Sequence, residues 1–238
     1  MEHGHSFEEI QNRIGQPGSI NHLKDIVFGG IDGAVTTFAI VAGVQGAGLS
    51  PAIIVILGIA NVFADGFSMA MGNYLGTKSE RDDIARIREI ESRHIRDVPE
   101  GETNEIRRIL QLKGLEGQTL DDATLAITRN KEAWIDMMLV DEYGKSPVNP
   151  EPVRSAGATF LSFFVCGLVP VLPFLVGMDE AFLAATIATT CTFFAIGMLK
   201  SVWSLASWWR SGLETTLIGS AAAGIAYAAG YAMSKFAN

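Results

Sequence analysis

The sequence has few charges and few cysteines for its length. Only 18% of its 238 residues are charged and its mean hydropathy is +0.26, values that do not fit an ordinary soluble domain. Cys166 and Cys191 lie in apolar runs, so neither a disulfide framework nor a thiolate metal site is expected. The net charge of −8 without a basic patch argues against nucleic acid as a partner. No GxxxxGK[ST] loop is present, which argues against ATP coupling within this chain.

Long apolar runs are what the sequence does have. A helix needs roughly 20 mainly apolar residues to cross a bilayer core. Five segments meet this condition: 25–46, 51–75, 155–177, 181–199 and 213–233. Pro170 and Pro173 are expected to kink the third. In the fifth, the small residues Ala222, Ala226 and Gly230 form a face for close helix packing, within the chain or between copies.

The loops between these segments alternate in charge. Lys and Arg precede the first segment, fill the central region and flank the turn before the last segment, whereas the other two turns carry none. This pattern places the N-terminus and the central region in the cytoplasm. The sequence therefore predicts an all-α integral membrane protein with a disordered cytoplasmic tail (1–23), two transmembrane helices (24–76), a cytoplasmic helical domain (77–152) and three further transmembrane helices (153–238).

Polar residues at membrane depth are the first candidates for a functional site. Asp32 and Asp65 each cost about 2.5 to 3.5 kcal/mol at that depth when ionised. Asn61, Asp65 and Met69 follow four-residue spacing and share one helix face. Counting from the cytoplasmic ends places Asp32 and Met69 at a similar depth. Carboxylate, amide and thioether ligands together suit iron(II), and the oxygens also accept manganese(II).

Two other interpretations of these residues stay open. Met69 in an apolar helix can be a packing residue. Asp32, between Gly30 and Gly33, can mark a helix break with a local hydrogen bond.

Two motifs carry a family resemblance. DIVFGGIDGAVTTFAIVAGVQGAG and GIANVFADGFSMAMGNYLGTKSE resemble the vacuolar iron transporter family, and the similarity covers about residues 20–235. It implies a five-span homodimer, without a permanent cofactor, that moves iron(II) and often manganese(II) out of the cytosol in exchange for protons. The expected location is a bacterial inner membrane, or otherwise a vacuolar or other organelle membrane.

The resemblance also assigns roles within the membrane. The family's aspartate falls on Asp32 and its methionine on Met69. Plant members have a glutamate where this chain has Asn61, and Asp65 adds a carboxylate one turn later. Either residue can take the part of that glutamate.

The central region is expected to form a three-helix bundle. The second span continues without a breaker to about residue 97, a second helix runs from near Glu102 to before Gly114, and a third runs from about Leu120 to a cap at Gly144. Thr119, three residues before Asp122, is expected to cap the start of the third helix.

The resemblance places metal ligands on these helices. The expected set comprises Glu91, His94, Glu102, Glu105, Met137, Met138 and Asp141, with Glu142 as a substitute for Asp141. His94 and Asp141 stand where plant members have glutamate. Three-residue spacing puts Glu91 with His94, and Glu102 with Glu105, on common helix faces. A solvated charged face is the competing interpretation. His3, His5, Glu8 and Glu9 in the tail are weaker candidates.

The leading hypothesis is a transporter without enzymatic activity. Two alternatives to it remain. The Glu91-x-x-His94 pair resembles half of a di-iron carboxylate site, which would suit a membrane-anchored ferroxidase. A metal sensor anchored by the spans is the other, although it leaves Asp32 and Asp65 without a role.

Overall fold

The computed structural model describes residues 6–14 and 22–237, and every regular element in that part of the chain is a helix. The chain forms two compact units. We call Asn21–Leu75 with Pro152–Asn238 the apolar unit, and Met1–Ile20 with Gly76–Glu151 the bundle unit. Helix α3 (Pro51–Asp97) is continuous and belongs to both, as the sequence predicts.

The apolar unit holds most of the long hydrophobic helices. Its further elements are α2 (Leu23–Gly46), α7 (Pro152–Leu168), α8 (Leu172–Leu175), α9 (Ala181–Lys200), the 3₁₀ turn η1 (Ser201–Trp203) and α10 (Trp208–Ala237). Among the described residues, four helices are long and apolar enough to cross a membrane: α2, α3, α9 with η1, and α10. The expected third span is interrupted between Leu168 and Leu172, where Pro170 lies, and α7 alone is shorter than a full span. The five-span count therefore stays a prediction.

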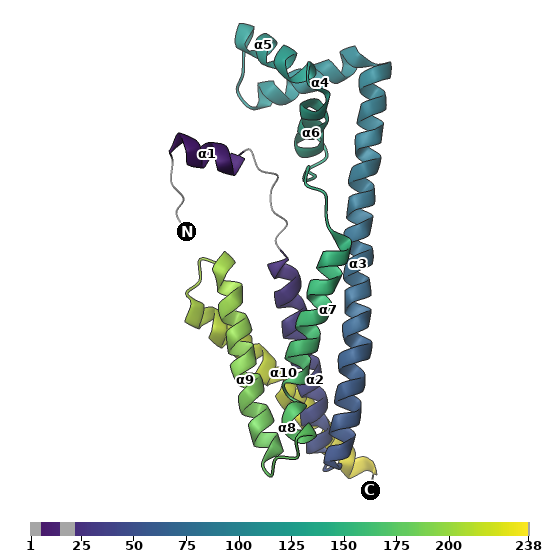
Figure 1. Cartoon of the computed structure of the whole chain (residues 1–238), viewed down its shortest axis with the longest axis vertical. Helices are drawn as coiled ribbons and strands as arrows, with labels where there is room; N and C mark the ends of the chain where they lie inside the picture. The colour runs from purple at the N-terminus through teal and green to yellow at the C-terminus, as the bar shows by residue number, and fades with distance from the viewer. Residues whose placement is uncertain (1–5, 15–21, 238) are drawn as a thin grey trace. The chain divides into compact units, whose positions relative to one another are not determined.

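Helix α2 lies among α7, α9 and α10 (Figure 1). Its Gly33 packs against the backbone of Phe163 in α7, an approach that a side chain would prevent. Phe38 and Val41 of α2 extend this core towards Phe193 of α9. Because α2 is unbroken from Leu23 to Gly46, the helix-break interpretation of Asp32 is wrong.

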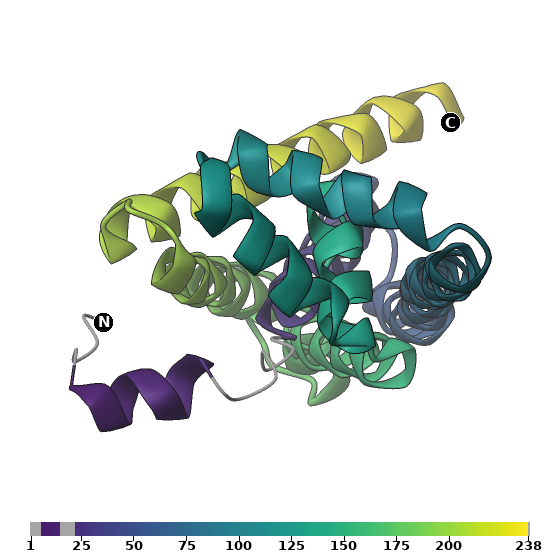
Figure 2. The same cartoon turned by 90° about the horizontal axis from the view of Figure 1, so that it is seen from above.

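Helix α10 crosses the apolar unit obliquely and is seen lengthwise in Figure 2, where α9 is seen nearly end-on. Its small residues permit close contact with α2. A Cβ atom at Gly230 would collide with the backbone of Gly43, and one at Gly43 would lie 3.4 Å from the carbonyl oxygen of Ala226. The small-residue face is therefore a packing face within the chain.

Replacing Gly230 by valine is expected to lower the thermal stability of the purified protein. The added side chain has no space beside Gly43, and overpacking of this kind costs about 1 to 3 kcal/mol. The melting temperature in detergent, followed by size-exclusion chromatography after heating, measures the effect. Gly224→Val is the matched control, because no atom lies within 4 Å of a Cβ at Gly224. Equal stability of both variants would show that the contact is not tight.

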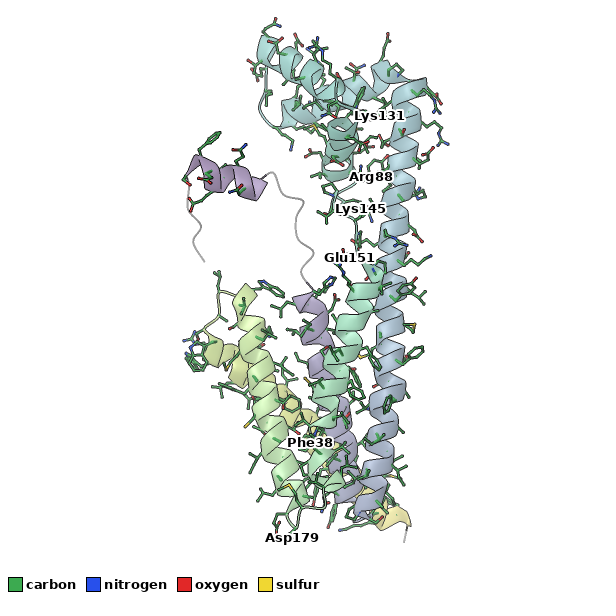
Figure 3. All side chains as sticks on the ribbon, viewed as in Figure 1. Phe38, Arg88, Lys131, Lys145, Glu151 and Asp179 are labelled. Atoms are coloured by element: carbon green, nitrogen blue, oxygen red, sulfur yellow. The ribbon has the colours of Figure 1, made fainter. Side chains whose placement is uncertain are left out.

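The bundle unit is built around α6. Its helices after α3 are α4 (Pro99–Leu112), α5 (Gly117–Thr128) and α6 (Lys131–Asp141). One face of α6 packs Trp134 and Met138 against α4 and α5, and another packs Ile135 and Leu139 against α3. The segment after α6 is tied to α3 by an ion pair of 2.9 Å between Lys145 and Asp83, and Arg88 of α3 reaches Asp136 of α6 (Figure 3).

Three details of this region correct the sequence prediction. The expected single helix over 120–144 is two helices, because Asn130 starts a new one by accepting a hydrogen bond from the Ala133 amide. Helix α5 begins at Gly117, so Thr119 lies inside it and does not cap it. Helix α4 begins three residues before Glu102, at Pro99, a residue suited to a first turn. The expected turn at Gly144 is present, with φ of +64°.

The N-terminal tail also differs from the prediction of disorder. Residues Phe7–Ile14 form helix α1, and Ser6 and Glu9 form a reciprocal capping box at its start. Glu8 and Glu9 lie in its first turn, and His3 and His5 lie outside the described residues.

Candidate functional site

A line of polar side chains joins α2 and α3 inside the apolar unit. The Asn61 amide donates hydrogen bonds to the hydroxyls of Thr36 (3.3 Å) and Thr37 (3.2 Å). One turn further along α3, the Asp65 carboxylate is close enough to Asp32 for the two charges to repel each other. No ion pair joins either aspartate to a basic side chain in the described part of the chain, so this pair leaves uncompensated negative charge between two apolar helices.

The same line continues to the start of α2. The Asn73 amide donates to Asp25 Oδ1 at 2.9 Å and to the Thr159 hydroxyl of α7 at 2.7 Å. The second Asp25 oxygen lies 3.2 Å from His22 Nδ1. These contacts fix the first turn of α2 and the first half of α7 against the middle of α3. We call the whole line, from Thr36 to Asp25 on α2 and from Asn61 to Asn73 on α3, the polar seam.

The polar seam sets the register of the two antiparallel helices. Asn61 lies opposite Thr37, Asp65 opposite Asp32 and Asn73 opposite Asp25. As residue numbers rise along α3, the numbers of the facing residues on α2 fall by a similar amount. Met69 therefore faces the level of residues 28 and 29, about one helical turn, roughly 6 Å, from the level of Asp32. The depth count from the sequence predicts a similar level for these two residues, because it takes no account of how the helices are shifted.

Sequence reasoning identified Asp32, Asn61 and Asp65 of the polar seam but missed Asn73 and Asp25. The signal was available, since Asn73 continues the same four-residue spacing along α3. It was overlooked because Asn73 lies near the predicted end of the membrane span, where a polar side chain is usually solvated. Only the tertiary contacts show that it lies between α2, α3 and α7.

The bundle unit brings a second set of ligands together. One ligand atom each from Glu91, His94 and Glu102 lies within 4.8 Å of the others, the only such group of three or more in the residues that the structure describes. Glu91 and His94 lie near the end of α3, and Glu102 follows on α4 after the sharp turn at Val98. His94 Nδ1 lies 3.3 Å from Glu102 Oε1.

Burial makes this cluster costly without a cation. Glu91 is 1% exposed and Glu102 is 6% exposed, and one carboxylate oxygen of each has no hydrogen-bond partner among the described residues. Burial, with the neighbouring charge of Glu91, raises the pKa of Glu102 to about 7. Unpartnered buried oxygens are rare in native proteins, and a divalent cation would satisfy both. Carboxylate and imidazole ligands together suit a divalent ion such as iron(II) or manganese(II).

Comparison of the sequence with known proteins assigns this chain to a family. The sequence matches the VIT family over residues 23–231. It is 34% identical over 211 residues to vacuolar iron transporter 1 of Arabidopsis thaliana, covering 86% of this chain and 83% of the relative. This chain belongs to the VIT family. More distant relatives include vacuolar iron transporter 1 of rice (Oryza sativa subsp. japonica), at 32% identity with 97% and 90% coverage, and the vacuolar iron transporter of Toxoplasma gondii, at 30% with 89% and 74%.

Two further acids border the cluster in this VIT-family chain. The charges of Glu105 and Glu142 help to raise the pKa of Glu102. The pKa of Glu142 is itself raised by burial and by the charges of Glu105 and Glu91. Five predicted ligands thus share one electrostatic environment, namely Glu91, His94, Glu102, Glu105 and Glu142.

The remaining predicted ligands are engaged elsewhere. Asp141 forms an ion pair of 2.6 Å with Lys113. Met138 is fully buried in the hydrophobic core beside Trp134 and Ile106, and Met137 packs against the same core. Their role as ligands stays a prediction, and Glu142 is better placed than Asp141 to act with the cluster.

Tyr143 is a member of the site that sequence reasoning missed. Its hydroxyl donates to Glu91 Oε1 at 2.9 Å, which leaves the other oxygen of Glu91 as the unpartnered one. The turn that ends α6 positions it, because the Tyr143 amide bonds to the Met138 carbonyl and Gly144 adopts positive φ. Only the three-dimensional contact could identify it, since a tyrosine in a turn carries no ligand pattern of its own.

Removing the Tyr143 hydroxyl is expected to weaken metal binding by the VIT-family bundle. Groups that orient a metal ligand typically contribute tenfold or more in affinity, so Tyr143→Phe should raise the Mn²⁺ dissociation constant about tenfold. Competition with a fluorescent chelator measures this in the full-length protein. Tyr231→Phe in α10 is the control and should leave the constant unchanged. Unaltered affinity in Tyr143→Phe would mean that Glu91 is held without this hydrogen bond.

Proposed function

We propose that this chain is a secondary transporter that moves iron(II), manganese(II) or both out of the cytosol in exchange for protons. The observation that carries the proposal is the polar seam, in which Asp32 and Asp65 face each other between two apolar helices. Carboxylates at membrane depth are costly and usually mark an ion pathway. Membership of the VIT family, whose matched relatives are named vacuolar iron transporters, supports iron as the substrate.

The bundle unit supplies the second part of the proposal. We expect the cluster of Glu91, His94 and Glu102 to collect metal in the cytoplasm before it passes to the seam. His94 adds an imidazole ligand, which favours iron(II) or manganese(II) over magnesium or calcium, cations that prefer oxygen ligands alone. Metal, protons and membrane lipid are thus the proposed partners, and a homodimer is the proposed assembly.

The orientation rests on the positive-inside rule. The basic residues of the central region, and Lys200 with Arg210 between the last two helices, are placed on the cytoplasmic side. This orientation requires α7 and α8 together to form a short, interrupted span, the third of five along the chain. A bacterial inner membrane is the proposed location, with a vacuolar or other organelle membrane as the alternative.

Transport is tested by loading purified protein into liposomes and following Mn²⁺ or Fe²⁺ uptake with an internal fluorescent chelator. Protein-containing vesicles should take up metal well above protein-free vesicles, and an internal pH lower than the external pH should accelerate uptake. Binding without uptake would refute a transport function.

The ferroxidase alternative is separated by a different readout. One Glu91-His94-Glu102 cluster is half of what a four-helix di-iron site contains. Incubation of the purified protein with Fe²⁺ in air should therefore consume oxygen no faster than a Glu91→Gln variant. Faster oxygen consumption by the wild type would favour an enzyme. Metal uptake by the wild type without added oxygen consumption would favour the transporter.

A further inference from the structure

His22 lies immediately before α2, at the end of the polar seam that holds Asp25. Its Nδ1 atom is 3.2 Å from Asp25 Oδ2 and 3.4 Å from the Ser155 hydroxyl oxygen of α7. The His22 and Asp25 side chains are 20% and 18% exposed, so the pair is largely enclosed but still reaches solvent. In the proposed orientation, this end of the seam faces the cytosol. The pair therefore lies where a proton that follows the seam would reach the cytosol.

The hydrogen bonds of Asp25 direct a proton towards His22. The Asn73 amide nitrogen donates to Asp25 Oδ1 at 2.9 Å, and it also donates to the Ser155 carbonyl at 3.3 Å. An amide nitrogen only donates, so Oδ1 is occupied as an acceptor. A proton bound to Asp25 is therefore placed on Oδ2, the oxygen that faces His22 Nδ1.

Polar groups continue from Asp25 towards Asp32. The Thr159 hydroxyl of α7 belongs to the same hydrogen-bond network as Asp25. About one turn further along α7, the Ser162 hydroxyl lies against Gly29, a residue of α2 between the two aspartates. Seven residues of helix, roughly 10 Å, separate Asp25 from Asp32. Hydroxyl groups thus line part of the interval that a proton from Asp32 has to cross.

The charged groups near the pair are few. Asp25 is the acidic group in contact with His22. Lys24 and Arg154, in the first turns of α2 and α7, are basic, and α3 presents the neutral Asn73. Imidazole ordinarily changes charge between about pH 5 and 8, so a histidine at this position can accept and release a proton at cytosolic pH.

We propose that His22 passes the coupling proton from Asp25 to the cytosol. The transfer breaks the O–H bond at Oδ2 of a protonated Asp25 and forms an N–H bond at His22 Nδ1, which leaves a carboxylate beside an imidazolium. The imidazolium then loses a proton to cytosolic buffer, and both groups regain their starting charges. This step rests on the proposed exchange of metal for protons and assigns it a residue at the cytosolic end.

Loss of the imidazole should slow transport without weakening metal binding. His22→Gln keeps a polar side chain beside Asp25 and Ser155 but removes the group that carries the proton. In liposomes with the cytoplasmic face outward, the maximal rate of Mn²⁺ uptake should fall on the order of 100-fold, the lower end of what a positioned proton acceptor contributes. The Mn²⁺ dissociation constant of the bundle should stay at the wild-type value. Lys24→Gln, in the same helical turn, is the control and should leave both quantities unchanged.

A small imidazole buffer separates proton transfer from a structural role. Adding 4-methylimidazole to the external solution should restore uptake by His22→Gln towards the wild-type rate and should leave the wild type and Lys24→Gln unchanged. A wild-type rate in His22→Gln would overturn the proposal, and so would a slow rate that the buffer does not relieve. Absence of uptake by the wild type in the same assay would instead refute the transport function itself, and this step with it.

Discussion

Replacing Asp32 by asparagine is expected to lower metal transport in proteoliposomes by about 100-fold or more. Asparagine keeps the size of the side chain and removes the charge that faces Asp65. A divalent ion between α2 and α3 would then have one carboxylate available in the variant, whereas the wild type offers two. Because Thr36 bonds to the backbone carbonyl of residue 32 and not to its side chain, the helix should remain intact.

The matched control for this variant is Asp179→Asn. Asp179 lies in the exposed turn before α9 (Figure 3) and carries the same charge outside the polar seam. Metal uptake by Asp179→Asn should match that of the wild type, and the maximal rate of Asp32→Asn should fall while metal binding to the bundle is retained. Transport by Asp32→Asn within twofold of wild type would remove the seam from the pathway.

Replacing Glu102 by glutamine is expected to have the second largest effect, on metal affinity and not on the maximal rate. Loss of one buried carboxylate from the cluster should raise the metal concentration for half-maximal uptake about 10- to 100-fold. The rate at saturating metal should change little, because the seam is untouched. Glu100→Gln, an exposed acid on the same helix, is the control and should leave both quantities unchanged.

The pH dependence of binding follows from the same residue. The pKa of Glu102 is raised to about 7, so below that pH the metal-free cluster holds a proton that the metal must displace. Affinity for Mn²⁺ should therefore fall as the pH drops below 7, by up to about tenfold per pH unit, and should change little above it. In the Glu102→Gln variant, the fall in Mn²⁺ affinity below pH 7 should be absent. A wild-type affinity that is flat between pH 5.5 and 7 would contradict the assignment.

The stability of the metal-free bundle should change with pH in the opposite sense. The folded-state pKa of Glu102 lies above its ordinary value of 4.5, so the folded bundle binds the proton more tightly than the unfolded chain. This contribution to the free energy of unfolding is fully present below pH 4.5 and is lost as the pH rises towards 7. Added metal should reverse the trend, because it stabilises the ionised form.

The sequence predicted the boundary between the first two apolar helices well, because local signals mark it. Pro51 begins α3 and Gly46 ends α2, as expected from the apolar runs. The break between α5 and α6 was missed because Asn130 acts as a cap through one side-chain bond, which outweighs an uninterrupted helical pattern.

The candidate sites were predictable only in part. Glu91, His94 and Glu102 come together because α3 and α4 meet at a turn, and the pattern of acids on both sides of that turn is visible in the sequence. Tyr143 and Asn73 were not predictable, since each acts through a contact with a residue at least 48 positions away. The levels of Asp32 and Met69 differ by a helical turn because register depends on the contacts between helices and not on the length of either.

The central claim is that this chain carries a divalent metal across a bilayer against protons, and simultaneous recording of both fluxes tests it most directly. Wild-type protein is placed in liposomes containing a metal-sensitive dye and a pH-sensitive dye, without an imposed gradient. External Mn²⁺ or Fe²⁺ should enter while protons leave, so the interior becomes more alkaline in proportion to metal uptake, and Asp32→Asn should show neither change. Metal uptake with constant internal pH would contradict exchange for protons, and constant signals from both dyes would contradict transport itself.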